Sequence, residues 1–157
     1  MKTFCSDIRD FKAEKEADVV FTNPPYMKTS SGRGNILDAK NIARHEVQGN
    51  IFDFLLSAKR LLKYGGNFYA VYRPDRLTDL IVAMRESGIE PKRATFVHSD
   101  TSAESSMVLI EGKRGGKEGM RLTPPLIIYE SENSRKYTAD MDYIMENGAF
   151  PEKFTAK

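Results

Sequence analysis

Residues 18–28 read DVVFTNPPYMK, an apolar run that leads directly into two consecutive prolines. Up to Thr22 it is a nearly continuous run of β-branched and aromatic residues, which is typical of a strand covered on both faces in a parallel sheet. Asn23-Pro24-Pro25-Tyr26 follow at once. Proline cannot donate to a sheet ladder and it restricts the residue before it, so the pair ends the strand and stiffens the departing chain. An amide and a phenol therefore stand directly beyond the carboxyl end of the strand.

Strands and helices alternate on both sides of this stretch. Residues 3–5 form a short β-like run. Apolar residues recur at helical spacing over 50–63, ahead of Gly65-Gly66, which we expect to stop that helix. Pro74-Asp75 open a second helix, which Gly88 closes. Further strands are predicted at 67–72, 93–98, 106–111 and directly after Pro124-Pro125, and the C-terminus is polar.

The order of these elements predicts an α/β fold with a mostly parallel sheet, built as a single domain over residues 1–157. Residues 27–48 interrupt the alternation. They are polar and glycine-bearing, and they favour a helix only from about Asp38. We predict that they form a flexible substrate loop that feeds a short helix.

The composition is that of an ordinary globular protein. The chain has 157 residues, of which 40% are hydrophobic and 29% charged. It contains no apolar run long enough to span a membrane, and its single cysteine, Cys5, suits a reducing, cytoplasmic compartment. The net charge of +2 permits a nucleic-acid partner without demanding one. No spacing of His, Cys, Asp and Glu indicates a metal site.

The Asn-Pro-Pro-Tyr motif has the parts needed to handle an amine. In an open α/β sheet, ligands bind beyond the carboxyl ends of the strands. The Asn23 side-chain oxygen and the Pro24 carbonyl are two acceptors held side by side. They suit a planar group with an NH2, because they can hold its hydrogens, aim its lone pair and stabilise the charge that develops on nitrogen. Tyr26 would stack on a base that has left its helix or loop. The alternative, a rigid turn with a half-buried tyrosine, is weakened by the position after a strand.

At this motif the chain resembles the class I, S-adenosylmethionine-dependent amino-methyltransferases, and among them the bacterial adenine-N6 methyltransferases of valine tRNA. The resemblance covers essentially the whole chain and includes IARHE (42–46), LLKYGGNFYAVYRPDRL (61–77), GIEPKR (88–93), SSMVLIEGKRGG (105–116) and LTPPLIIYE (122–130). It implies a Rossmann-like sheet, S-adenosylmethionine as cofactor, and methyl transfer to the exocyclic N6 amine of an adenine beside the anticodon of a tRNA.

The resemblance also implies roles for individual residues. Asn23, Pro24 and Tyr26 would form the methyl-acceptor site. Asp7 would contact the adenine amino group of the cofactor, Ile8 would pack on its ring, and Asn23 would also face the cofactor. Without the family context, Asp7 is better explained as a turn residue at the end of a strand.

Part of the family pattern is absent from the sequence. The glycine-rich loop and the acidic strand end that hold the cofactor precede the segment that matches residue 1. Neither Gly32-Arg33-Gly34, Gly65-Gly66 nor 112–119 replaces them. We therefore expect an incomplete sheet without its first strands, the C-terminal two-thirds of an enzyme. The absent strands would leave apolar sheet edges exposed, which favours a homo-oligomer.

Basic residues near the motif are candidates for tRNA contacts, because cations on phosphates position a nucleic acid without reading its sequence. The candidates are Lys28, Arg33, Lys40 and Arg44 around the loop, Arg73 and Arg76 after the 67–72 strand, and a denser cluster of Lys113, Arg114, Lys117 and Arg121. A solvated surface is the alternative for each of them. Neither His45 nor His98 is needed as a base, since the methylated ammonium loses its proton readily to water.

Two other functions remain open from the sequence. The same motif could methylate another NH2 group: a glutamine of a release factor, an adenine in DNA or a guanine in ribosomal RNA. The chain could also be an inactive fragment that binds RNA or oligomerises. Activity before and after the missing N-terminal third is restored would separate this last alternative from the first two.

We predict that this chain alone binds S-adenosylmethionine weakly or not at all, because it holds the acceptor half of the site and little of the cofactor half. Isothermal titration calorimetry tests this directly. A micromolar dissociation constant would contradict the prediction.

Overall fold

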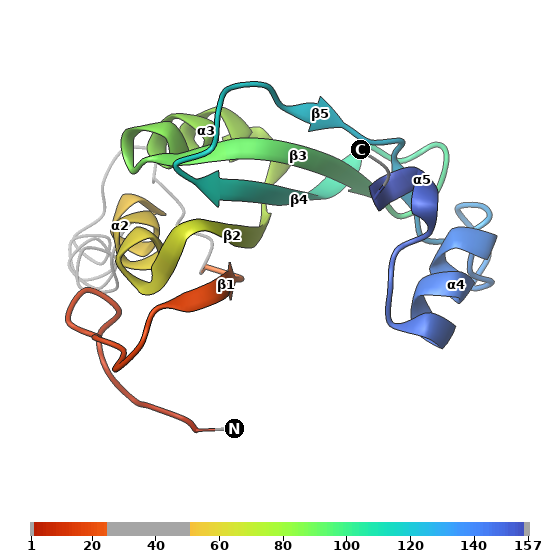
Figure 1. Cartoon of the computed structure of the whole chain (residues 1–157). Coiled ribbons are helices and arrows are strands. Elements are labelled where there is room, and N and C mark those ends of the chain that lie inside the picture. Colours follow the sequence, from red (N-terminus) through yellow and green to blue (C-terminus); the bar gives the residue numbers. More distant parts are fainter. Residues whose placement is uncertain (1, 25–50, 156–157) are drawn as a thin grey trace, which may run out of the picture.

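In the computed structural model, which describes residues 2–24 and 51–155, helices and strands alternate along the chain (Figure 1). The elements are β1 (Ala17–Thr22), α2 (Ile51–Leu61), β2 (Leu62–Tyr72), the 3-10 turn η1 (Pro74–Arg76), α3 (Leu77–Glu86), β3 (Ile89–His98), β4 (Ser105–Arg114), β5 (Arg121–Leu122), β6 (Leu126–Ile127), α4 (Ala139–Asn147) and α5 (Glu152–Thr155). Among the described residues the predicted alternation is confirmed from β1 to β3, and strands β4, β5 and β6 then follow without a helix between them.

One sheet joins all the strands of the described residues. Its order is β1-β2-β4-β3-β5, and β6 also pairs with β3. β1 is parallel to β2, and β5 and β6 are parallel to β3, whereas β4 is antiparallel to both of its neighbours. The prediction of a mostly parallel sheet therefore holds for every strand except β4. The short connection 99–104 between β3 and β4 explains the exception, because a parallel pair needs a longer crossover.

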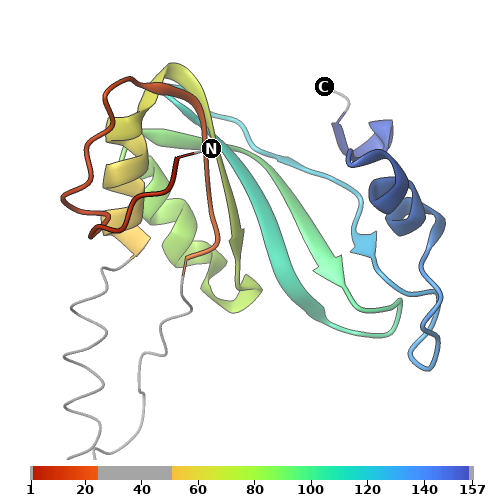
Figure 2. The same ribbon diagram turned by 90° about the horizontal axis from the view of Figure 1, so that it is seen from below.

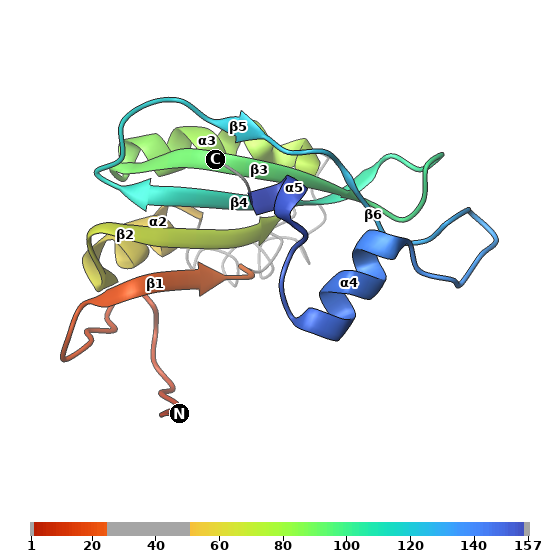
Figure 3. The same ribbon diagram turned by 45° about the vertical axis from the view of Figure 1, so that its right-hand side comes forward.

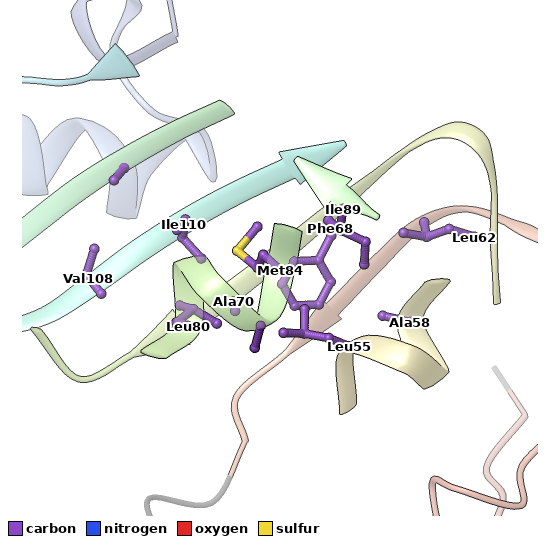
Figure 4. Close-up of a cluster of buried hydrophobic side chains, with 12 residues drawn as sticks. Leu55, Ala58, Leu62, Phe68, Ala70, Leu80, Met84, Ile89, Val108 and Ile110 are labelled. Carbon is purple, nitrogen blue, oxygen red and sulfur yellow. The ribbon is translucent and has the colours of Figure 1, made fainter. Parts of the chain in front are cut away.

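Helices α2 and α3 cover one face of this sheet (Figures 1 and 2). Their inward residues share one apolar core with alternate residues of β2, β3 and β4. Figure 4 shows the fully buried Phe68 of β2 among Leu55 of α2 and Leu80 and Met84 of α3. The hydrophobic effect on this face holds the helices against the three central strands.

A second, smaller cluster lies at the far end of β3, where α4 and α5 stand apart from α2 and α3 (Figure 3). Val97, Leu126 and Phe154 are its buried members. The Thr138 hydroxyl accepts a hydrogen bond from the Met141 N–H and caps the start of α4, and Gly148, with φ of +61°, ends that helix. Both helices lie where the sequence predicts only a polar C-terminus, so neither was predicted.

Two expectations about the N-terminal part are corrected. Residues 3–5 form no strand, because no neighbouring strand lies beside them in the described residues. β1 is not covered on both faces: Val20 packs on the core, whereas Val19 is 49% and Phe21 82% exposed. β1 is thus an edge strand with one apolar face open, as far as the described residues extend.

Gly65-Gly66 were wrongly expected to stop the helix. α2 ends at Leu61, and both glycines lie inside β2, where the pairing with β1 skips from Leu62 to Asn67. Gly65 has φ of +79°, a conformation that favours glycine. A Cβ on Gly66 would lie 2.9 Å from the Lys63 carbonyl oxygen and 3.0 Å from that of Asp18. The glycines therefore allow a bulge that brings β2 close to β1.

No helix within residues 2–24 and 51–155 is long and apolar enough to cross a membrane.

Replacing Phe68 by Ala is expected to lower the free energy of unfolding by about 3–5 kcal/mol, because it opens a cavity in the main core. Urea denaturation measures the change. Phe21→Ala is the matched control, since the same ring is removed from an 82% exposed position. We expect a change within about 0.5 kcal/mol there. Equal losses in the two variants would contradict the assignment of the core.

Candidate functional site

The parallel pairing of β1 with β2 fixes the position of the Asn-Pro-Pro-Tyr motif. Thr22 pairs with Ala70, so the chain leaves β1 at the same edge of the sheet at which β2 ends. Asn23 is exposed at this edge and Pro24 is buried. The expected position beyond the carboxyl end of the strand is thus confirmed for Asn23 and Pro24. Pro25, Tyr26 and the predicted 27–48 loop with Lys28, Arg33, Lys40 and Arg44 lie outside the described residues.

The two arginines that follow β2 lie at the same carboxyl edge. Arg73 Nη2 is 2.6 Å from Asp75 Oδ2, and Arg76 Nε is 2.5 Å from Asp79 Oδ2. Their side chains remain 42% and 35% exposed. Exposed ion pairs of this kind are weak, so they leave the guanidinium groups able to exchange an aspartate for a phosphate. Contact with RNA remains a prediction for both.

The predicted cofactor residues lie in a turn before β1. Asp7 Oδ1 accepts hydrogen bonds from the backbone N–H and the Nε of Arg9, both at 2.9 Å, and Oδ2 accepts from Arg9 Nη2 at 2.6 Å. These bonds lower the pKa of the Asp7 carboxyl to about 2. A carboxylate offers about four acceptor positions, and within residues 2–24 and 51–155 the donors of Arg9 occupy three of them, which leaves room for one further donor. Ile8 beside it is half-buried.

Two curated proteins are similar in sequence to this chain. The chain is 31% identical over 110 residues to the tRNA1(Val) (adenine(37)-N6)-methyltransferase of Phocaeicola vulgatus, a match that covers 68% of this chain and 45% of the relative. It is 25% identical over 130 residues to the protein of the same name from Dyadobacter fermentans, covering 82% of this chain and 53% of the relative. The chain is a homologue of these methyltransferases. It spans about half the length of either curated relative.

Solved structures show the fold of this methyltransferase homologue. A predicted O-methyltransferase from Agrobacterium tumefaciens superposes with a TM-score of 0.68 at 19% identity, over 93% of this chain and 62% of that chain. The fold is thus the Rossmann-like sheet of class I methyltransferases, as the resemblance implies. No family model matches the chain.

The described residues of the homologue fit one end of S-adenosylmethionine. An ionised Asp7 with a free acceptor position suits the exocyclic amine of adenine, and Ile8 supplies an apolar side chain next to it. The remainder of the cofactor needs a turn of backbone amides at the carboxyl edge of the sheet. Within residues 2–24 and 51–155, Gly65, Gly88 and 112–116 all lie at the opposite, amino edge. The fit is therefore limited to the adenine end.

An apolar groove of about 260 Å³ lies on the sheet face opposite α2 and α3. Phe21 of β1 and Phe150 and Phe154 of the C-terminal segment line its two sides. The Arg93–Glu111 ion pair lies across its floor.

Arg93 and Arg121 both donate to the Phe154 carbonyl, at 3.0 and 2.8 Å, so Arg121 holds α5 in place. Arg114 donates hydrogen bonds to Glu16 and to the Leu62 carbonyl. Two of the arginines predicted to contact tRNA, Arg114 and Arg121, therefore have structural partners elsewhere in the chain.

Two polar residues of α2 contact the Asp7 turn but were not predicted from the sequence. Ser57 and Arg60 bond backbone atoms of residues 8–11, about fifty positions earlier in the chain. Nothing local distinguishes Arg60 from an ordinary basic residue in the last turn of a helix. Its partners become visible only in the folded structure, where residues 8–11 lie beside α2.

The Asp7–Arg9 pair leads to a prediction about pH. Arg9→Ala is expected to raise the pKa of Asp7 from about 2 towards its ordinary value of 3.8, because the bonds to the guanidinium are lost. The folded pKa lies below the unfolded one, so the pair stabilises the fold fully above pH 4, and this contribution disappears as the pH falls towards 2. Carboxyl 13C shifts of Asp7, followed by NMR from pH 6 to 1.5, measure the change.

Lys12→Ala is the control for that titration, because it removes one positive charge from the same segment. An unchanged pKa in the Arg9 variant, or an equal rise in the Lys12 variant, would show that Arg9 is not the cause.

Proposed function

We propose that this chain carries the methyl-acceptor half of an N-methyltransferase that transfers a methyl group from S-adenosylmethionine to the exocyclic N6 amine of an adenine in tRNA. The observation that carries the proposal is the placement of Asn23 and Pro24 at the carboxyl end of β1, in a chain with the class I methyltransferase fold. The names of both curated relatives support adenine 37 of a valine tRNA as the target.

Asn23 and Pro24 act on the amine. In the proposal, the Asn23 side-chain oxygen and the Pro24 carbonyl accept its two hydrogens and aim the nitrogen lone pair at the methyl donor. Pro24 is buried, so its carbonyl is held by the packed chain while exposed Asn23 faces the substrate. Both acceptors also stabilise the charge that develops on nitrogen. Tyr26 stacks on the flipped base.

S-adenosylmethionine, when bound, would supply the methyl group, and Asp7 and Ile8 would hold its adenine end. The surplus proton of the methylated nitrogen passes to water, so no histidine is required. His98, at the end of β3, instead bonds the Ala103 carbonyl through Nδ1 at 2.9 Å. It fixes the β3–β4 connection.

The tRNA backbone would approach along the carboxyl edge. Arg73 and Arg76 lie there, and Lys28, Arg33 and Arg44 follow the motif in the sequence. Because phosphate contacts add to affinity in a salt-dependent way, these residues would set affinity and register while the acceptor site selects the base.

Asn23→Ala is expected to reduce methyl transfer by about a hundredfold or more, since it removes one preorganised acceptor from the transition state. Transfer of tritiated methyl groups to a tRNA transcript measures it. The chain is assayed at millimolar S-adenosylmethionine, both alone and fused at its N-terminus to the part of the Phocaeicola vulgatus relative outside the match. Asn133→Ala is the control, because Asn133 is exposed in the distant loop before α4.

The same assay is run with release factor, duplex DNA and ribosomal RNA fragments. Transfer to any of these but not to tRNA would overturn tRNA as the proposed substrate, while N-methylation as the proposed reaction would stand. Transfer to tRNA that is equal in the Asn23 and Asn133 variants would overturn the proposed acceptor site. Absence of transfer to all substrates, with tRNA still bound by the fusion, would favour an inactive RNA-binding module.

A further inference from the structure

The turn that carries Asp7 and Ile8 presents three carbonyl oxygens to one point. The Asp7 carbonyl accepts from the N–H groups of Asp10 at 3.1 Å and Phe11 at 3.0 Å, which closes a helix-like turn. The carbonyl oxygens of Ile8, Arg9 and Phe11 then converge. Such a group of unsatisfied carbonyls carries partial negative charge and attracts a cation.

The cation at that point is Arg60, near the C-terminal end of α2. Its Nη2 lies 3.1 Å from each of the three carbonyl oxygens. Ser57, one turn earlier on the same helix, is 1% exposed, and its hydroxyl donates to the Ile8 carbonyl at 2.9 Å while accepting from Arg60 at 3.2 Å. One buried hydroxyl and one guanidinium therefore join the turn to α2.

The helix that supplies these groups is firmly seated. Leu55 and Ala58, on either side of Ser57, are buried in the main core with Phe68. The position of Ser57 and Arg60 is therefore set by the sheet, through the packing of α2. The turn before β1 contains no helix or strand of its own to fix it.

We infer that Arg60 is a positioning residue for the cofactor side of the site: with Ser57 it holds the 7–11 turn on α2 and so sets where Asp7 and Ile8 meet the adenine group. The adenine ligand in this inference rests on the proposed function, whereas the position of the turn rests on its contacts with Ser57 and Arg60 of α2. A lysine places one compact charge and cannot present the planar fork of arginine, so Arg60→Lys should restore the function only in part.

Two measurements on the full chain test the inference. Hydrogen exchange of the Asp10 and Phe11 amides reports whether the turn is held. Saturation-transfer NMR of adenosine, which detects weak binding, reports whether the adenine contact survives. In Arg60→Ala we expect the two amides to exchange about tenfold faster or more, since charge-assisted bonds are lost. We expect the adenosine signal to fall about threefold or more, as it should in Asp7→Asn.

Lys59→Ala is the matched control, because it removes a positive charge from the adjacent, exposed position of the same helix. Exchange and adenosine signal should stay within about twofold of the parent there. Arg60→Lys should lie between the parent and Arg60→Ala in both readouts. Exchange of core amides in β2 checks that each variant is folded.

The outcomes separate the inference from the proposed function. Unchanged exchange in Arg60→Ala would overturn the anchoring role. Faster exchange with an unchanged adenosine signal would overturn the positioning role. If the parent chain gives no adenosine signal at all, the proposed adenine contact of Asp7 and Ile8 fails, and the exchange data alone decide whether Arg60 holds the turn.

Discussion

The parallel pairing of β1 with β2 is the constraint on which the rest of the site depends. It brings the end of β1 to the edge at which β2 also ends, and so places Asn23 on the same side of the sheet as Arg73. The pairing in turn needs the bulge at Gly66, because any side chain there would press on the Asp18 carbonyl of β1. It also needs Phe68, which ties β2 to the helices behind it. The backbone geometry at Gly66 and the apolar packing of Phe68 thus determine the position of the exposed Asn23 side chain.

The parts of the fold that local signals encode were predicted from the sequence. The strand that ends at Asn23-Pro24 and the helix over 51–61 follow from runs, spacing and proline alone. The glycines at 65–66 were misread because two glycines after an amphipathic run look the same whether they end a helix or allow a bulge. Only the register with β1 separates the two cases. The open face of β1 was missed for a related reason, since burial depends on which elements lie beside a strand.

The C-terminal helices and the Asp7 turn depend on contacts between distant residues, which a single sequence does not display. Arg93 and Arg121 hold α5 through the Phe154 carbonyl, and Arg60 holds the turn through three carbonyls of its own. In both places an arginine satisfies backbone acceptors that no sheet or helix partner satisfies. From composition alone, such arginines are indistinguishable from those that would contact tRNA. The structure gives Arg114 and Arg121 partners in distant parts of the chain, whereas Arg73 and Arg76 pair with nearby aspartates at the carboxyl edge.

The two sides of the candidate site are built by different physical means, and α2 connects them. The proposed acceptor side is set by the sheet, because Asn23 and Pro24 continue a paired strand. The proposed cofactor side is set by polar contacts, because Asp7 and Ile8 lie in a turn that Ser57 and Arg60 hold. Since Leu55 and Ala58 seat α2 in the same core that supports β2, a shift of the helix would move Asp7 relative to Asn23. Because the proposed methyl transfer depends on the alignment of donor and acceptor, we expect packing beneath α2 to affect that reaction without touching either substrate.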